Sequence, residues 1–274
     1  MRNKVVIVCI IKDEEKYIRE FCQYHLALGF DKIYLGDNTP PDKDSPYGEI
    51  LKDFIGQGTV EMIDVRGKQN YQNTFYNETM DLLSRDSETQ WALFIDVDEH
   101  LTLVRDKNVH EFMDKLPHAN QVMVNWLMMD PCGQVRYEDR PLEERFPNKI
   151  DAGENPNGCC WNNHVKCFVR IIGGGERIGS FNLPHNCSNV PLTTDPLGKV
   201  IPSSPFNNNP DYSVAYIKHF HLKSIQEYVE NKMMKGWSDR NGNSLNWYVK
   251  DFKYFNPTPQ AVSWLLEKVY KLTH

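Results

Sequence analysis

The chain has 274 residues, of which 40% are hydrophobic and 25% are charged, with a formal net charge of −6 at pH 7. This balance is typical of a folded globular protein and excludes a chain dominated by disorder. The negative charge argues against a broad nucleic-acid-binding surface, so we expect no nucleic-acid partner. The length predicts one large α/β domain over residues 1–222, followed by C-terminal helices over residues 223–274.

The sequence shows neither the signal-peptide pattern of a secreted protein nor the long apolar stretch of a membrane-spanning one. The N-terminus lacks the basic, apolar and small-residue succession of a signal peptide, and no apolar stretch is long enough to span a bilayer. Seven cysteines, an odd number, favour reduced thiols over a disulfide framework. Cys159, Cys160, His164 and Cys167 indicate zinc only weakly, because the chain contains no CxxC pair. We expect a cytoplasmic protein, with peripheral contact at the inner face of a membrane left open by lysines in the terminal helices.

Strand-like and helix-like patterns alternate over the first hundred residues. Lys4 to Ile11 is an almost continuous β-branched run, and the stretch after it has helical spacing up to Gly29, with Asp13 as the expected N-cap. Further strands are expected over residues 32–35, over 59–65 and from Trp91, and further helices over residues 47–55 and 73–84. Such alternation predicts a mostly parallel sheet with right-handed crossovers.

The pattern changes beyond Asp106. Strands are expected over residues 121–129 and 164–172, separated by a loop rich in charge, Pro, Asn and Gly. The triplet Gly173 to Gly175 favours a hairpin turn, because no helical pattern follows it directly. Residues 184–211 are crowded with Pro, Asn and Ser and predict a long loop that is a candidate lid. Helices are expected over residues 224–235 and 259–272.

The strand that begins at Trp91 ends in the carboxylates Asp96, Asp98 and Glu99, followed by His100. Acidic side chains at the carboxyl end of a buried parallel strand meet solvent where open α/β sheets bind ligands. Their oxygens suit a hard cation such as Mg²⁺ or Mn²⁺, which can in turn hold a diphosphate. Neither GxGxxG nor GxxxxGK[ST] occurs, so we expect the phosphates to be held through the metal.

Several sequence blocks, taken in order, resemble glycosyltransferase family 92-like proteins and their relatives in family 2. The main blocks are KDEEKYI at 12–18, YHLALGFDKIYLGDN at 24–38, QNYQNTFYN at 69–77, FIDVDEHL at 94–101, VKCFVR at 165–170 and HFHLKSIQEYVENKMMKG at 219–236. The resemblance implies a GT-A fold with a nucleotide-binding half over residues 1–105 and an acceptor-side half over 106–222. It also implies a nucleotide-sugar donor, favouring UDP, with Mn²⁺ or Mg²⁺ at a DxD motif and a saccharide or lipid-linked glycan as acceptor.

The resemblance also implies roles for individual residues. Asp98 is the better metal candidate and Asp96 the better nucleotide contact that shares the metal, while His219 matches a late histidine that could complete the metal shell. Glu99 is expected to act on the metal only indirectly. The nucleotide is expected to contact Ile11, Asp13, Asp37, Asn38 and Asn70, with Glu14 and Gln69 nearby and Lys223 against the diphosphate. Lys166 and Arg170 are alternative cationic clamps.

An inverting mechanism, which the family suggests, requires a carboxylate base that takes the proton of the acceptor hydroxyl. The sequence does not single out one residue for this role. Asp130 and Glu144 are the predicted candidates, and Asp211 is a rival. Asp130 also fits a plain turn former.

The preferred prediction is a hexosyltransferase that acts in polysaccharide or glycoconjugate synthesis, and three other functions compete with it. A phosphohydrolase is suggested by DVDEH, but His100 stands where its motif has Thr or Val. A nucleotidyltransferase needs a Gly-rich, basic loop after the first strand, and KDEEKY is a poor substitute. A non-catalytic sugar-nucleotide-binding module would keep the sheet without turnover.

Overall fold

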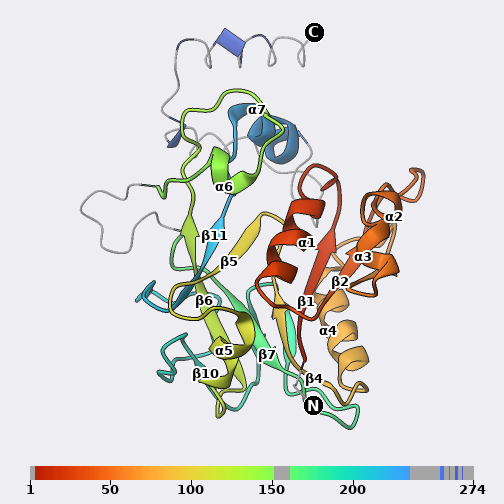
Figure 1. Ribbon diagram of the computed structural model, residues 1–274, viewed down its shortest axis with the longest axis vertical. Helices are drawn as coiled ribbons and strands as arrows, with labels where there is room; N and C mark the ends of the chain where they lie inside the picture. Colours follow the sequence, from red (N-terminus) through yellow and green to blue (C-terminus); the bar gives the residue numbers. More distant parts are fainter. Residues whose placement is uncertain are drawn as a thin grey trace. The chain divides into compact units, whose positions relative to one another are not determined.

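The computed structural model describes residues 4–150 and 161–234, together with Tyr254, Phe255, Pro259, Ser263, Trp264 and Glu267. The chain divides into two compact units, Met1–Leu127 with Cys160–Lys218, and Met128–Cys159 with His219–His274 (Figure 1). The second unit combines a segment from the middle of the chain with the C-terminal segment. The predicted domain boundary at residue 222 stays a prediction. Most of the predicted helix over 259–272, and the cysteines Cys159 and Cys160, lie outside the described residues.

The first unit is built on a mixed β-sheet with the strand order β3-β2-β1-β4-β7-β6-β11-β5, and β10 pairs beside β6 (Figure 1). Its parallel part consists of β1 (Lys4–Ile11), β2 (Lys32–Asp37), β3 (Val60–Asp64) and β4 (Thr89–Phe94). β7 (Val165–Arg170) runs antiparallel to both β4 and β6 (Gln121–Met128). The predicted α/β class is confirmed. The sheet predicted to be mostly parallel is parallel over β1 to β4, whereas β7 gives it an antiparallel part.

The remaining strands were not all expected. β5 (Glu99–Leu103) follows β4 after a short turn, and β11 (Ala215–His219) lies between β6 and β5 in the sheet. The expected long loop contains β9 (Asn186–Ser188) and β10 (Thr193–Thr194). The prediction of a hairpin at Gly173 to Gly175 is wrong, because β7 pairs with β4 and β6, whereas β8 (Ser180–Leu183) pairs with β9.

Helices fill the connections between the parallel strands. They are α1 (Ile18–Ala27), α2 (Tyr47–Ile50), α3 (Lys52–Gly56) and α4 (Gln72–Leu83), with α5 (Val109–Asp114) after β5. The prediction that Asp13 caps α1 is wrong. The N-cap position is Tyr17, and Asp13 lies in the preceding turn with a positive φ of 57°. A side-chain cap is present at a different helix, α5, where the side chain of Asn108 accepts hydrogen bonds from the N–H groups of His110 and Glu111.

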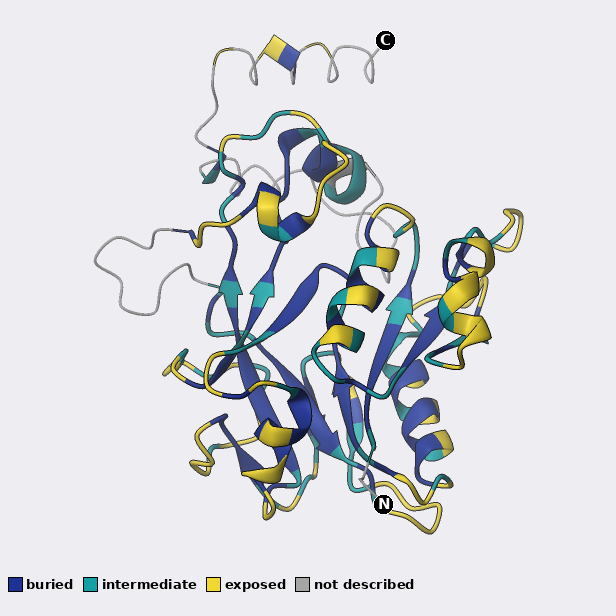
Figure 2. Cartoon of the chain, in the orientation of Figure 1, coloured by how far each residue is buried: buried dark blue, intermediate teal, exposed yellow. Residues whose placement is uncertain are grey.

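Burial explains why β1 is rich in β-branched residues. β1, β2 and β4 are buried along most of their length (Figure 2), whereas β3 is buried only at Val60. Phe75 of α4 packs against β2 at Gly36, where a Cβ atom would lie 2.7 Å from the ring. Gly36 therefore allows α4 to approach the sheet closely, one residue before the acidic end of β2.

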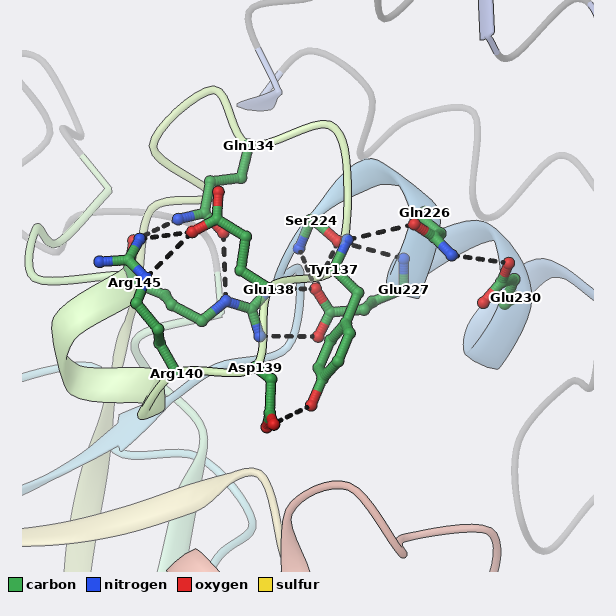
Figure 3. A network of polar contacts seen from close by, with 10 residues as sticks. All are labelled: Gln134, Tyr137, Glu138, Asp139, Arg140, Arg145, Ser224, Gln226, Glu227 and Glu230. Atoms are coloured by element: carbon green, nitrogen blue, oxygen red, sulfur yellow. Dashed lines mark hydrogen bonds and ion pairs between the residues drawn. The ribbon is translucent and has the colours of Figure 1, made fainter.

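The second unit contains α6 (Leu142–Arg145), α7 (Ile225–Tyr228) and a π-helix over Val229–Met234. The predicted helix from Ser224 begins as expected, because Ser224 and Glu227 form a capping box. Glu227 also pairs with Arg145 inside the network drawn in Figure 3, and the side chains of both are fully buried. Among the described residues, no helix is long and apolar enough to span a membrane.

Candidate functional site

Acidic and amide side chains meet at the edge of the sheet where the parallel strands end. Ile11 pairs with Asp37 in the register of β1 and β2, and Val8 pairs with Phe94 one strand further. Asp96 lies two residues after Phe94, just beyond the end of β4. The predicted residues Ile11, Asp37, Asn38 and Asp96 are thus brought to one edge, as the sequence predicts.

The end of β2 is fixed by local hydrogen bonds. The Asp37 carboxylate accepts hydrogen bonds from the backbone N–H of Thr39, at 2.9 Å, and from its hydroxyl, at 2.6 Å. The backbone N–H of Asn38 donates to the carbonyl of Ile11, also at 2.9 Å. Asp37 is only 6% exposed, whereas Asn38 is half-buried, so Asn38 offers the more accessible side chain.

Two other predicted nucleotide contacts lie in the loops that leave this edge. Asp13 follows β1 and Asn70 precedes α4, with positive φ angles of 57° and 52°. Aspartate and asparagine tolerate this left-handed backbone better than most residues. Asp13 is half-buried and Asn70 is exposed. Their contacts with a nucleotide stay predictions.

Asp96 is held by two side chains from other parts of the chain. One carboxylate oxygen lies 2.7 Å from the Nζ atom of Lys166 in β7, and the other accepts a hydrogen bond from Gln72 of α4 at 2.8 Å. The Lys166 side chain is 1% exposed, whereas that of Asp96 is 37% exposed. Burial favours the neutral amine, but the charges of Asp96 and Glu99 outweigh it and raise the pKa of Lys166, so the ammonium stays charged.

Glu99 shapes the turn that carries the acidic motif. Its side chain is fully buried, and one of its oxygens accepts the N–H of Asp96 at 3.0 Å and lies 3.8 Å from Lys166 Nζ. The N–H of Glu99 in turn donates to the carbonyl of Asp96 at 3.1 Å. Burial raises the pKa of the Glu99 carboxyl well above its usual value. Glu99 therefore stabilises the turn through the backbone of Asp96, and its indirect role at a metal stays a prediction.

The two alternative cationic clamps have separate places. In the antiparallel register of β4 and β7, Arg170 pairs with Trp91, at the opposite end of β4 from Asp96. Arg170 donates hydrogen bonds to the carbonyls of Ala119 and Pro117, and its guanidinium lies 4.3 Å from the centre of the Trp91 ring. The prediction that Arg170 clamps a diphosphate is therefore wrong, and Lys166 is engaged with Asp96.

The acidic motif offers oxygen ligands for a cation. Asp98 is 7% exposed and follows Asp96 by two residues. Within residues 4–150 and 161–234, no group of three or more His, Cys, Asp or Glu side chains is arranged to hold a metal ion. Mg²⁺ in nucleotide sites is commonly bound by one or two carboxylates together with substrate phosphates. The donor set of Asp96 and Asp98 fits a cation of that kind.

The other predicted site residues belong to the second unit, apart from Asp211. His219 and Lys223 are both 6% exposed, Asp130 is half-buried and Glu144 is exposed on α6. The Asp130 carboxylate accepts the N–H of Cys132 at 2.6 Å, which agrees with a turn former. The roles of these four residues stay predictions. Asp211 is exposed and accepts hydrogen bonds from Ser213, which lower the pKa of its carboxyl.

The family is settled by comparison with known proteins. Residues 4–233 match the family model described as glycosyltransferase family 92. The chain belongs to this family. Membership confirms the predicted family, a family of glycosyltransferases, and it agrees with the predicted GT-A fold.

The individual proteins that this chain resembles share little sequence identity with it. A segment of 116 residues is 25% identical to galactan beta-1,4-galactosyltransferase GALS3 of Arabidopsis thaliana, and it spans 41% of this chain but only 23% of that protein. Among solved structures, S. aureus TarS matches with 16% identity and a TM-score of 0.35 over 51% of this chain and 23% of TarS. Mannosyl-3-phosphoglycerate synthase from Rubrobacter xylanophilus matches with 13% identity and a TM-score of 0.32, over 61% and 53% of the two chains.

Proposed function

We propose that this family 92 chain transfers a hexose from a nucleotide-diphosphate sugar, with a UDP-sugar favoured, to a saccharide acceptor. The observation that carries the proposal is the position of Asp96 and Asp98 beyond β4, at the edge that also holds Asp37 and Asn38. Open α/β sheets bind nucleotides at this carboxyl edge. Polysaccharide or glycoconjugate synthesis in the cytoplasm, with peripheral contact to a membrane, belongs to the same proposal.

Different residues at this edge contact different parts of the donor. Asn38 and Asp37 lie at the end of β2 and serve the nucleoside, with Ile11 beside them at the end of β1. Asp96 lies beyond the next strand and serves the ribose or the diphosphate. Because Lys166 and Gln72 hold its two oxygens, the Asp96 carboxylate is fixed in position before the donor binds.

A divalent cation, Mn²⁺ or Mg²⁺, would be held by Asp98, with Asp96 as a further donor. The role of His219 as a metal ligand stays a prediction from the family resemblance. When bound, the cation stabilises the negative charge that develops on the β-phosphate as the nucleoside diphosphate leaves. Lys166 limits the repulsion among Asp96, Asp98 and Glu99, since its buried ammonium lies against two of these three carboxyl groups. The acidic turn can therefore keep its conformation in the absence of a bound cation.

The acceptor hydroxyl must lose its proton as its oxygen attacks the anomeric carbon. In the inverting mechanism that we propose, a carboxylate takes this proton. Asp130 and Glu144 stay the proposed bases. Glu144 is exposed on the one-turn helix α6, while Asp130 already accepts a backbone hydrogen bond, so Glu144 is the more accessible of the two.

The test is a turnover assay with a panel of donors. The purified chain is incubated with Mn²⁺ and UDP-galactose, UDP-glucose, UDP-N-acetylglucosamine or GDP-mannose, with and without oligosaccharide acceptors, and release of the nucleoside diphosphate is measured. UDP-galactose comes first because the curated relative is a galactosyltransferase by name. We expect one donor to be used, with a loss of at least about 100-fold in Asp98→Asn.

The matched control is Asp53→Asn, since Asp53 is an exposed aspartate that pairs with Arg19 on the surface. We expect its turnover to equal that of the wild type. Equal turnover by Asp98→Asn and the wild type would contradict a donor site at Asp98. Release of inorganic phosphate alone would contradict sugar transfer and favour a phosphohydrolase.

A further inference from the structure

A cluster of aromatic rings lies next to the proposed donor site in the first unit. The ring of His164 stacks on Trp126 at 4.9 Å, with an angle of 8° between the planes. His185 meets both rings edge-on, at 5.3 Å from Trp126 and 5.4 Å from His164. Phe206 completes the cluster, edge-on to His164 at 4.8 Å. These four residues come from separate parts of the chain.

The cluster is connected to Asp96 through Lys166. The carbonyl of Pro184, next to His185, lies 3.4 Å from Lys166 Nζ, and that atom lies 2.7 Å from Asp96. The Nδ1 atom of His185 lies 3.1 Å from the carbonyl of Val165, the residue before Lys166. The aromatic rings therefore adjoin the acidic turn, on the side of β7.

Phe206 combines an exposed ring with a fixed backbone. Its side of the cluster faces solvent, since Phe206 is 47% exposed. Its N–H donates to the hydroxyl of Ser204 at 3.2 Å, and Phe206 forms a β-bridge with His164. The next residue, Asn207, donates its N–H to the carbonyl of Asn163 at 2.7 Å. A single exposed phenylalanine is ordinary on a protein surface, but Phe206 is held edge-on against His164 on a tethered backbone, so less conformational freedom is lost when a partner binds it.

Amide groups continue the surface beyond the ring. Asn208 and Asn209 follow in the sequence and are exposed. The Oδ1 atom of Asn208 accepts a hydrogen bond from Asn163 at 2.9 Å, which orients its amide and leaves the donor end for another partner. Sugars present an apolar C–H face and a rim of hydroxyl groups. An aromatic ring beside oriented amides matches both, because the ring packs on the C–H face and the amides bond the hydroxyls.

We infer that Phe206, with Asn208 and Asn209, is a binding platform for a pyranose ring of the saccharide acceptor. The inference rests on the proposed function, because it gives the second substrate of the same reaction a place beside the donor. In this arrangement His164 contacts the Phe206 ring edge-on, and Trp126 stacks on His164 behind it. Lys166, His185 and His164 link the platform to Asp96 through a chain of contacts, so the acceptor would bind on the β7 side of the donor site.

The test compares saccharide binding with nucleotide binding in the full chain. Isothermal titration is done with four probes, the β-1,4-linked galactose, glucose and N-acetylglucosamine tetrasaccharides and maltotetraose, and separately with UDP and Mn²⁺. The variants are Phe206→Ala and Phe206→Tyr. The control is Val200→Ala, since Val200 is an apolar residue of the same segment and is 64% exposed.

We expect at least one tetrasaccharide to bind, with affinity about tenfold weaker in Phe206→Ala and retained in Phe206→Tyr and Val200→Ala. UDP affinity is expected to be unchanged in all three variants. Equal tetrasaccharide binding by Phe206→Ala and the wild type, or binding of UDP but of no tetrasaccharide by the wild type, would overturn the platform and leave the donor site standing. Saccharide binding that depends on Phe206 without any nucleotide binding would support the platform while the proposed transfer function fails.

Discussion

Two buried ion pairs, one in each unit, show how the same chemistry can serve different purposes. In the second unit the side chains of Arg145 and Glu227 are both 0% exposed. In the first unit Lys166 is 1% exposed, but its partner Asp96 is 37% exposed. The Arg145–Glu227 pair is therefore closed to solvent, whereas the Lys166–Asp96 pair is open on its carboxylate side.

The surroundings of the two pairs agree with this contrast. Glu227 also accepts hydrogen bonds from the N–H and hydroxyl of Ser224, and Gln134 lies against Arg145, so the closed pair is part of a local network (Figure 3). Asp96 instead stands at the sheet edge next to Asp98. The two partners of a closed pair depend on each other, because loss of one leaves a buried charge without a counterion, whereas an open pair holds one charged group in place for an incoming partner.

The largest predicted effect is at the closed pair. Arg145→Met leaves the fully buried Glu227 without its cation, so we expect the free energy of unfolding to fall by about 3–5 kcal/mol. Urea denaturation measures it. The control is Arg140→Met, because Arg140 forms an exposed pair with Glu138 in the same unit, and we expect a loss of at most about 1 kcal/mol. Equal losses in the two variants would remove the distinction between closed and solvated pairs in this unit.

A smaller effect on stability is expected from the titration of His185, whose pKa is lowered in part by Lys166 of the open pair. Burial, Lys166 and His164 lower the pKa of His185 to about 3, below the usual histidine value of 6.5. Between pH 6.5 and pH 3 the unfolded chain therefore binds more protons at this position, so stability falls as the pH falls through this window. We expect His185→Phe to be less sensitive, by about 2–3 kcal/mol between pH 6.5 and pH 4.5. Parallel stability curves for variant and wild type would refute the buried neutral histidine.

The smallest predicted effect concerns Lys166. Because Asp96 can be hydrated when its partner is lost, Lys166→Met is expected to cost about 1–3 kcal/mol of stability, less than the change at Arg145. Affinity for UDP with Mn²⁺ should fall about tenfold, since Asp96 is no longer fixed. Lys32→Met is the control, as Lys32 forms a surface pair with Glu61 at the opposite end of β2 from Asp37. Unchanged UDP affinity in Lys166→Met would show that Asp96 needs no such support.

Local patterns predicted the parallel half of the fold well. The four parallel strands were found because buried strands are continuous β-branched and aromatic runs, and the acidic edge followed from where such strands end. Helix starts were less certain. Asp13 has the composition of an N-cap, but its positive φ places it in a turn before α1.

Long-range pairing explains what the sequence could not predict. Lys166 meets Asp96 only because β7 enters the sheet antiparallel beside β4, and the two residues are 70 positions apart. Spacing alone made Lys166 and Arg170 equal candidates, although the register of β7 puts them at opposite ends of β4. The glycine triplet misled for a related reason, since β8 takes its partner from the chain that follows it. QNYQNTFYN was the available signal for Gln72, but nothing local indicated that Gln72 contacts Asp96.

The most direct test of the account is isothermal titration of UDP, with and without Mn²⁺, against the wild type, Asp98→Asn and the exposed-aspartate control Asp53→Asn. We expect Mn²⁺ to tighten UDP binding at least about tenfold in the wild type and in Asp53→Asn, and this gain to disappear in Asp98→Asn. UDP binding by Asp98→Asn that gains as much from Mn²⁺ as the wild type would contradict a donor site at the end of β4. Failure of UDP, GDP and CDP to bind the folded wild type would contradict the nucleotide-sugar reaction itself.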